Sequence, residues 1–149
     1  MNEIRVKRML LAGLATFLVW ILFEILLEHI IGQLLFGNFI QEQMLEAIDV
    51  QGWSASNQIL NIAIALLNST VLIWLYASLR PMYGVGTKTA LITSAFGIVW
   101  VWSMIINLIN LGLLPAQVGL IELGFETIEL PLAMLAGAQV YEGGGDRAG

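Results

Sequence analysis

Long apolar stretches, separated by short polar segments, dominate the chain. Four of them are long enough to cross a bilayer as helices, which takes about 20 mostly apolar residues. Together they occupy most of the 149 residues. We therefore predict an all-α fold, an integral membrane four-helix bundle over residues 1–142, and a short disordered tail at 143–149. The predicted helices are Met9–Leu35, Asn57–Leu79, Thr89–Leu114 and Ala116–Tyr141.

A shorter element is predicted between the first two helices. Apolar residues from Phe39 to Ile48 recur with helical spacing, and polar residues fill the other positions. Asn38, with a Gln three residues later, resembles a capping box, and Gly52 is a suitable stop. We predict a short amphipathic helix at about 38–51 that lies along the membrane interface.

The basic residues predict the orientation of the bundle. All six lie before the first helix, in the second loop or in the C-terminal tail. Because positive charge favours cytoplasmic loops, we predict a multi-pass protein of the cell membrane with both termini in the cytoplasm. The apolar stretch after the first basic cluster exceeds the 7–15 residues of a signal peptide, which predicts a retained signal anchor. The six residues are Arg5, Lys7, Arg8, Arg80, Lys88 and Arg147.

Acidic residues interrupt the first and last helices. A helix advances about 100° per residue, so the three carboxylates of the last helix share one stripe, and Glu24 and Glu28 share a face. Pro131 frees the carbonyl of Thr127 beside this stripe. Charged groups at such positions are costly unless they face protein or water. Candidate cation or metal ligands are Glu24, Glu28, His29, Glu122, Glu126 and Glu129, with Glu126 and Glu28 first.

Amide side chains lie on the two central helices. In the predicted topology they overlap in depth with the acidic residues, in the outer half of the bundle. We therefore predict one acidic, Asn-rich pocket, in which the amides orient carboxylates from a second shell. The four amides are Asn61, Asn68, Asn107 and Asn110.

Aromatic residues offer two further predictions. Trp20, Trp100 and Trp102 fall near mid-depth, where we expect them to pack or face lipid, with a pocket floor as the alternative. Trp53 and Tyr141 fit anchoring at the membrane interface.

The amino-acid composition excludes several classes of function. The chain is 58% hydrophobic and 11% charged, with a mean hydropathy of +0.85. A net charge of −5 argues against binding to nucleic acid, and the absence of cysteine removes disulfides and thiolate metal sites. We expect the lipid bilayer as a partner, with a homo-oligomer or a larger membrane complex as further possibilities.

The negative charge of the carboxylates in the predicted pocket has to be neutralised. Buried like charges cannot all ionise, so protons, a metal, a cationic ligand or basic residues of a partner must compensate them. Hydrogen bonds to the amides contribute only about 0.6 kcal/mol each, against about 2.5–3.5 kcal/mol to insert an acid. We therefore predict cation binding. One oxygen-ligated divalent cation suits these ligands better than a di-iron centre, because His29 directly follows Glu28 and no Glu-x-x-His motif occurs.

Two alternatives stay open. Small four-helix multidrug exporters are similar in length and topology and carry a glutamate in the first helix, as Glu24 does here, which would imply a small proton-coupled transporter of a cationic substrate. The other alternative is a non-catalytic subunit of a larger membrane complex. We do not expect a hydrolase, since no Ser–His–acid set is assembled around the single histidine.

Overall fold

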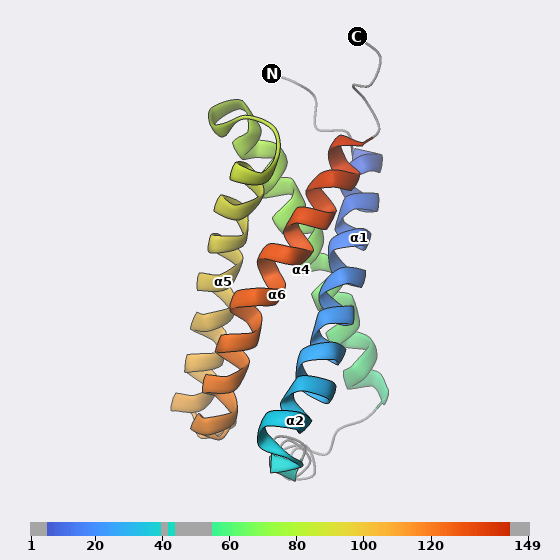
Figure 1. Cartoon of the computed structure of the whole chain (residues 1–149). Helices are drawn as coiled ribbons and strands as arrows, with labels where there is room; N and C mark the ends of the chain where they lie inside the picture. Colours follow the sequence, from blue (N-terminus) through green and yellow to red (C-terminus); the bar gives the residue numbers. More distant parts are fainter. Residues whose placement is uncertain (1–5, 40–41, 44–54, 144–149) are drawn as a thin grey trace.

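The protein is a bundle of long helices that run up and down past one another (Figure 1). The computed structural model describes residues 6–39, 42–43 and 55–143, and these ranges contain no strand. The predicted all-α fold with four long helices is confirmed. The predicted helix at 38–51 and the tail at 143–149 lie almost entirely outside the described residues. The elements are α1 (Val6–Glu24), η1 (Ile25–Gly32), α2 (Gln33–Phe36), α4 (Ala55–Tyr83), α5 (Thr87–Asn110) and α6 (Ala116–Glu142).

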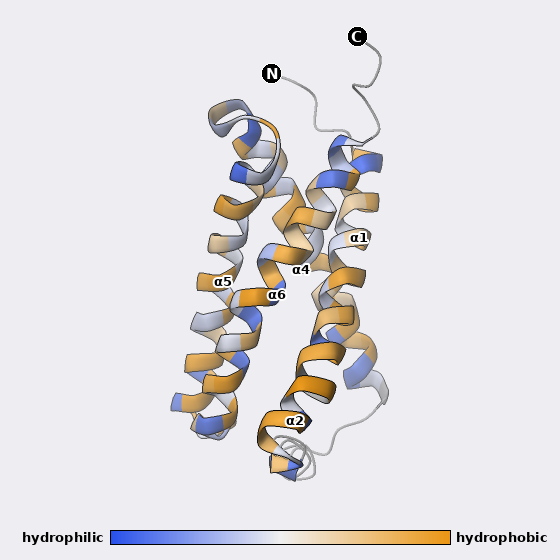
Figure 2. Ribbon diagram, viewed as in Figure 1, coloured by the Kyte–Doolittle hydropathy of each residue, from blue (hydrophilic) through white to orange (hydrophobic). Residues whose placement is uncertain are grey.

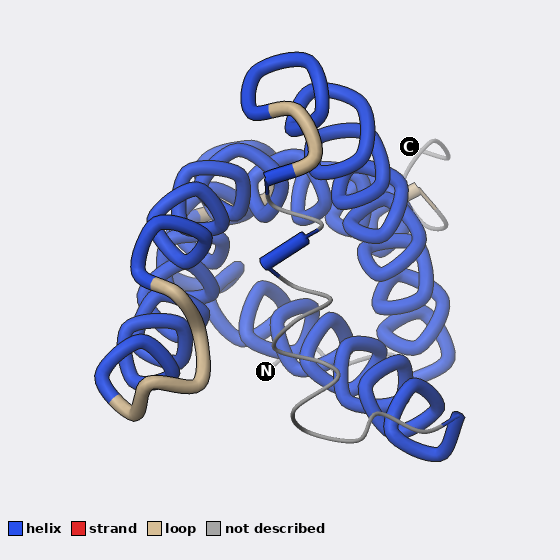
Figure 3. The backbone as a smooth tube through the Cα atoms, turned by 90° about the horizontal axis from the view of Figure 1, so that it is seen from below, coloured by secondary structure: helices blue, strands red, loops and turns tan. Residues whose placement is uncertain are grey.

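The first three elements form one continuous helical rod, so the bundle has four rods. α6 packs most extensively against α1 and α5, while α4 packs against α1 and, less closely, against α5. The rods therefore follow the order α1, α6, α5, α4 around a common axis, as the view along the bundle shows (Figure 3). The first turn of α1, the last turn of α6 and the loop between α4 and α5 lie at one end, here called the terminus end (Figure 1).

The connection between α5 and α6 is a tight turn at the opposite end, here called the far end. Gly112 has a φ of +70°, a conformation that glycine adopts without steric cost. Its amide donates to the Ile109 carbonyl, and Pro115 caps the start of α6, where its missing N–H is not needed. The turn makes α5 and α6 antiparallel neighbours, as the sequence predicts.

Small residues allow close helix crossings near the terminus end. A Cβ at Gly137 of α6 would collide with Thr16 Oγ1 and would lie 2.8 Å from Ile73 Cδ1. A Cβ at Gly13 of α1 would lie 2.9 Å from the Thr70 Cα of α4. Glycine at both positions therefore sets how closely α1 approaches α6 and α4.

The core fills the bundle in two sections. The section at the terminus end is built from all four rods, and it includes Ile73, Tyr76 and Met134. The second section lies between α5 and α6, where Val101, Ile105, Leu123 and Leu130 pack together. Its α6 residues, Leu123 and Leu130, precede Met134 of the first section along the helix, so the second section lies nearer the far end.

Apolar residues occur along most of the length of the helices (Figure 2). Large hydrophobic side chains such as Leu18, Phe96 and Leu132 are exposed. Three helical stretches are long and apolar enough, by length and composition, to cross a membrane. They are Val6–Phe36, Ser56–Tyr83 and Thr87–Asn110.

The expected fourth span, α6, is not among these three. Its 27 residues give a length of about 40 Å, which suffices for a bilayer. It differs from the three stretches above in its number of acidic residues, which are Glu122, Glu126, Glu129 and Glu142. α6 instead lies between α1 and α5, which cover two of its sides.

One aromatic prediction was wrong. Tyr141 is only 5% exposed, and its ring packs edge-on against Tyr76, so it belongs to the core rather than to an interfacial belt. Trp100 is 68% exposed, which agrees with the expected outward-facing position and excludes the alternative of a pocket floor. Trp20 packs against the second core section. Trp53 lies outside the described residues.

The close crossing at Gly137 gives a testable prediction. Gly137→Ala should lower the free energy of unfolding by about 1–3 kcal/mol, because the new methyl group has no room against Thr16 and Ile73. Thermal unfolding in detergent micelles measures the effect. Gly124→Ala in the same helix is the matched control, since a Cβ there meets nothing within 4 Å, and helix propensity favours alanine by about 0.5–1 kcal/mol. Equal behaviour of the two variants would contradict the proposed crossing.

Candidate functional site

The acidic stripe of α6 is the most unusual feature of the bundle. Glu129 is only 2% exposed, which makes it the one carboxylate that is buried among the described residues. Glu122 and Glu126 are half-buried. One oxygen of each of these three carboxylates is withdrawn from the molecular surface. The stripe therefore faces protein rather than the surroundings, but only Glu129 does so completely.

The helix contacts place Glu24 at the depth of this stripe. At the crossing of α1 and α6, Gly137 lies against Thr16. Glu24 follows Thr16 by eight residues and Glu129 precedes Gly137 by eight, so in antiparallel helices both lie about 12 Å from the crossing. Glu24 is half-buried. The backbone register thus aligns the acidic residues of α1 and α6.

A π-helix follows Glu24 directly. η1 runs for eight residues, whereas π-helices are rare and mostly single turns found at functional sites. A π-helix turns less per residue than an α-helix, so the angle of about 100° predicted between Glu28 and His29 does not hold for this segment. The side chains of Glu28 and His29 lie outside the described part of the chain, and their roles as ligands stay predictions.

Two side chains near the stripe donate hydrogen bonds to the backbone of α6. The Leu123 carbonyl accepts hydrogen bonds from Trp102 Nε1 at 3.2 Å and from Thr127 Oγ1 at 2.6 Å. The first bond ties α5 to α6 at the level of the acidic residues. α6 continues as a helix through Pro131, which has no N–H to offer the Thr127 carbonyl.

The predicted amides are not gathered around the carboxylates. Asn61, Asn107 and Asn110 are exposed, and Asn68 is half-buried. Asn68 lies two residues from Thr70, which touches Gly13, so its depth is that of the crossing between α1 and α4. This level is more than about 10 Å from Glu24. Their predicted role in the second shell receives no support from these positions.

The described candidate carboxylates each have an interaction partner, and they are not grouped as a set of metal ligands. Glu24, Glu122, Glu126 and Glu129 each take part in a polar or electrostatic interaction, so none stands without a partner. Among the side chains that the structure describes, no group of three or more His, Asp or Glu residues is arranged to hold a metal ion. Proton uptake needs only a single carboxylate, and Glu129 provides one away from water.

A second polar cluster, which the sequence did not reveal, lies at the terminus end. Tyr76 donates to Glu142 Oε1 at 2.9 Å and accepts from the Gly86 amide at 3.1 Å. Arg80 Nη2 forms an ion pair with Glu142 Oε2 at 2.8 Å, and its guanidinium lies 5.5 Å from the Tyr141 ring centroid. This network joins α4, its following loop and α6. Residues 76 and 142 are too far apart in sequence for any local pattern to pair them.

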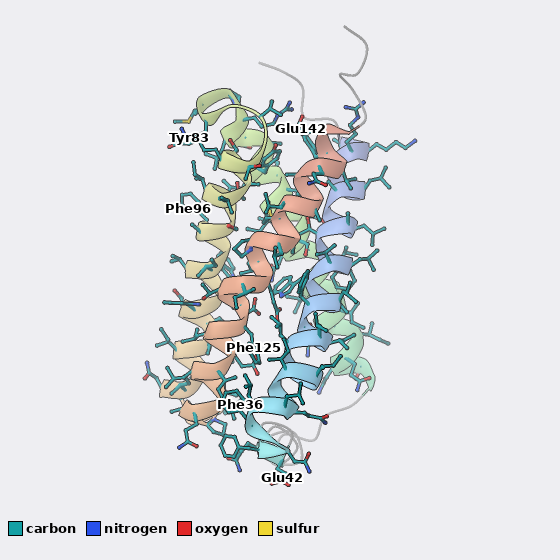
Figure 4. All side chains as sticks on the ribbon, viewed as in Figure 1. Phe36, Glu42, Tyr83, Phe96, Phe125 and Glu142 are labelled. Carbon is teal, nitrogen blue, oxygen red and sulfur yellow. The ribbon has the colours of Figure 1, made fainter. Side chains whose placement is uncertain are left out.

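The two ends of the bundle differ in charge. Every Lys and Arg that the structure describes lies at the terminus end: Lys7, Arg8, Arg80 and Lys88. Figure 4 shows Glu142 at this end, with Phe36 and Glu42 at the far end and Phe125 between them, in the half of α6 that carries the acidic stripe.

Comparison with protein-family models, with curated proteins and with solved structures finds no match to this chain. Function therefore has to be inferred from the residues of this chain and their arrangement.

The burial of the stripe can be tested with single cysteines, since the chain contains none of its own. Glu129→Cys should react with N-ethylmaleimide at least tenfold more slowly than Ile128→Cys in folded protein. The two positions have the same depth, but Ile128 is exposed and Glu129 is buried. Mass spectrometry follows the labelling, and denatured protein provides the full rate for each cysteine. Equal rates in the folded state would show that Glu129 does not face the interior.

Proposed function

We propose that this chain is an integral membrane protein that binds a cation at the acidic stripe of α6, in the outer half of the bundle. The proton is the first candidate for that cation, and a divalent metal is the second. Glu129 and Glu126 are the primary acceptors, with Glu122 and Glu24 at the same level of the bundle. The burial of Glu129 is the observation that supports this proposal most directly.

The physical reason is the cost of removing a carboxylate from water. Transfer of a carboxylate out of water disfavours its charged form, unless a cation or strong donors compensate it. A purely structural role would be served better by an apolar side chain, which has no such cost. The burial of Glu129 is therefore a reason to expect reversible occupation by a cation.

The alternatives are less well supported. A non-catalytic subunit would present its acidic groups to a partner, but Glu129 is covered by its own chain. A proton-coupled transporter needs a route to both sides of the membrane. The core section that contains Ile73, Tyr76 and Met134 fills the bundle between the stripe and the terminus end. Binding from the far end is consistent with this packing.

The orientation follows from the basic residues. Positive charge at the terminus end and its absence from the described part of the far end favour a cytoplasmic terminus end. In this orientation the acidic stripe is nearer the outer surface.

Single cysteines in two turns test the orientation. We expect Leu113→Cys, in the turn after α5, to react with a membrane-impermeant maleimide in intact cells. Val85→Cys, in the loop before α5, should react only after permeabilisation. Both residues are exposed apolar turn residues, so they are matched in accessibility and differ only in the end of the bundle. The opposite pattern would place the stripe near the cytoplasm.

Carbodiimide labelling tests cation binding. Dicyclohexylcarbodiimide reacts with protonated carboxyl groups in apolar surroundings, so Glu129 should be modified at low pH and less as pH rises and the group ionises. Glu129→Gln should remove the modified peptide, and Glu126→Gln should reduce it or shift its pH dependence. Glu142→Gln is the matched control, because Glu142 is ion-paired with Arg80 at the other end.

Titration with Mn²⁺ separates the two cations. If labelling decreases as the pH rises and is not affected by Mn²⁺, the site binds a proton. Saturable protection by Mn²⁺, together with stoichiometric metal in elemental analysis, identifies a metal site. Absence of labelling at Glu129 and Glu126 at every pH, combined with absence of bound metal, would overturn the proposal.

A further inference from the structure

A basic recess lies at the terminus end, on the side of the bundle where α1 meets α6. Its volume is about 500 Å³. It combines two cationic side chains from the first turn of α1 with apolar side chains from both helices. The lining residues are Lys7, Arg8, Leu11, Val140 and Gly143.

The lining has two chemically distinct parts. Lys7 and Arg8 form its charged part, and the guanidinium of arginine matches the geometry of phosphate oxygens. Leu11 and Val140 form its apolar part, and both are exposed. Leu10 and Leu14 continue the exposed apolar surface along α1 toward the middle of the bundle. Charge and apolar surface therefore follow one another along the membrane normal, in the order of headgroup and acyl chain.

The other described cations have different surroundings. Arg80 is paired with Glu142, and Lys88 Nζ lies 5.8 Å from the Tyr83 ring centroid. Arg8 also takes part in a polar or electrostatic interaction within the chain. Lys7 and Arg8 are the two cations that line the recess, so a ligand there would meet both of them.

We propose that the recess binds the phosphate headgroup of an anionic phospholipid of the cytoplasmic leaflet. Basic pockets between membrane helices on the cytoplasmic side are known to hold such headgroups. The lipid phosphate lies against Lys7 and Arg8, and the upper part of an acyl chain runs along Leu11 and Val140. This inference depends on the membrane orientation proposed above but not on cation binding by the stripe.

Native mass spectrometry of delipidated protein in detergent provides the test. With added phosphatidylglycerol or phosphatidylcholine, the wild type should retain phosphatidylglycerol preferentially. The double variant Lys7→Gln/Arg8→Gln should lose this preference by about tenfold or more, since each cation near a headgroup contributes roughly 1 kcal/mol. Lys88→Gln is the matched control, because it removes a cation at the same end, outside the recess.

Two further variants and a competition experiment test the same proposal. Val140→Trp fills the recess without a change of charge, and it should also lose the bound lipid; this variant serves if the double variant fails to fold. Glu129→Gln should retain phosphatidylglycerol, which separates this site from the acidic stripe. Equal retention by wild type and double variant would overturn the proposal. Displacement of phosphatidylglycerol by inorganic phosphate alone at millimolar concentration would also overturn it, because the acyl chain would then contribute nothing.

Discussion

The polar side chains of α6 have to be covered by other helices, and the bundle is arranged around this requirement. α6 carries more acidic residues than any other described helix, and it is also the helix with the most extensive contacts to its neighbours. α1 and α5 lie on its two sides, and their outer faces are apolar. A helix that would be expensive in lipid becomes tolerable when its acidic stripe faces protein.

Close packing at one end of α6 supports this arrangement. Gly137 lets α1 approach α6 near the terminus end, and the network of Tyr76, Arg80 and Glu142 fixes the same end from the side of α4. Toward the far end, η1 lies at about the depth of the stripe, and its π-helical turns depart from regular helix geometry. Rigid packing at one end and an irregular helix at the acidic level are consistent with a binding site held on a stable scaffold.

The sequence predicts the bounds of the helices well, but it does not predict which face of each helix is buried in the bundle. Apolar length locates α1, α4, α5 and α6 to within a few residues, since a bilayer fixes the length that a helix needs. Helical spacing also shows which residues share a face, but not which way the face turns. Asn61 and Asn68 share one, yet Asn61 is exposed. The burial of Tyr141 depends on its contact with Tyr76, which is distant in sequence, so no local sequence pattern predicts it.

The choice among cations depends on how many ligands each one requires. Ca²⁺ takes six to eight oxygen ligands, many of them from the protein, whereas Mg²⁺ keeps several waters and can be held by one or two carboxylates. A proton requires only one carboxylate that is shielded from water. Glu129 meets this condition, and Glu126 lies about one helical turn away on the same stripe. A metal held mainly by protein ligands would require more of them than the three carboxylates of the stripe supply, so the proton is the first candidate.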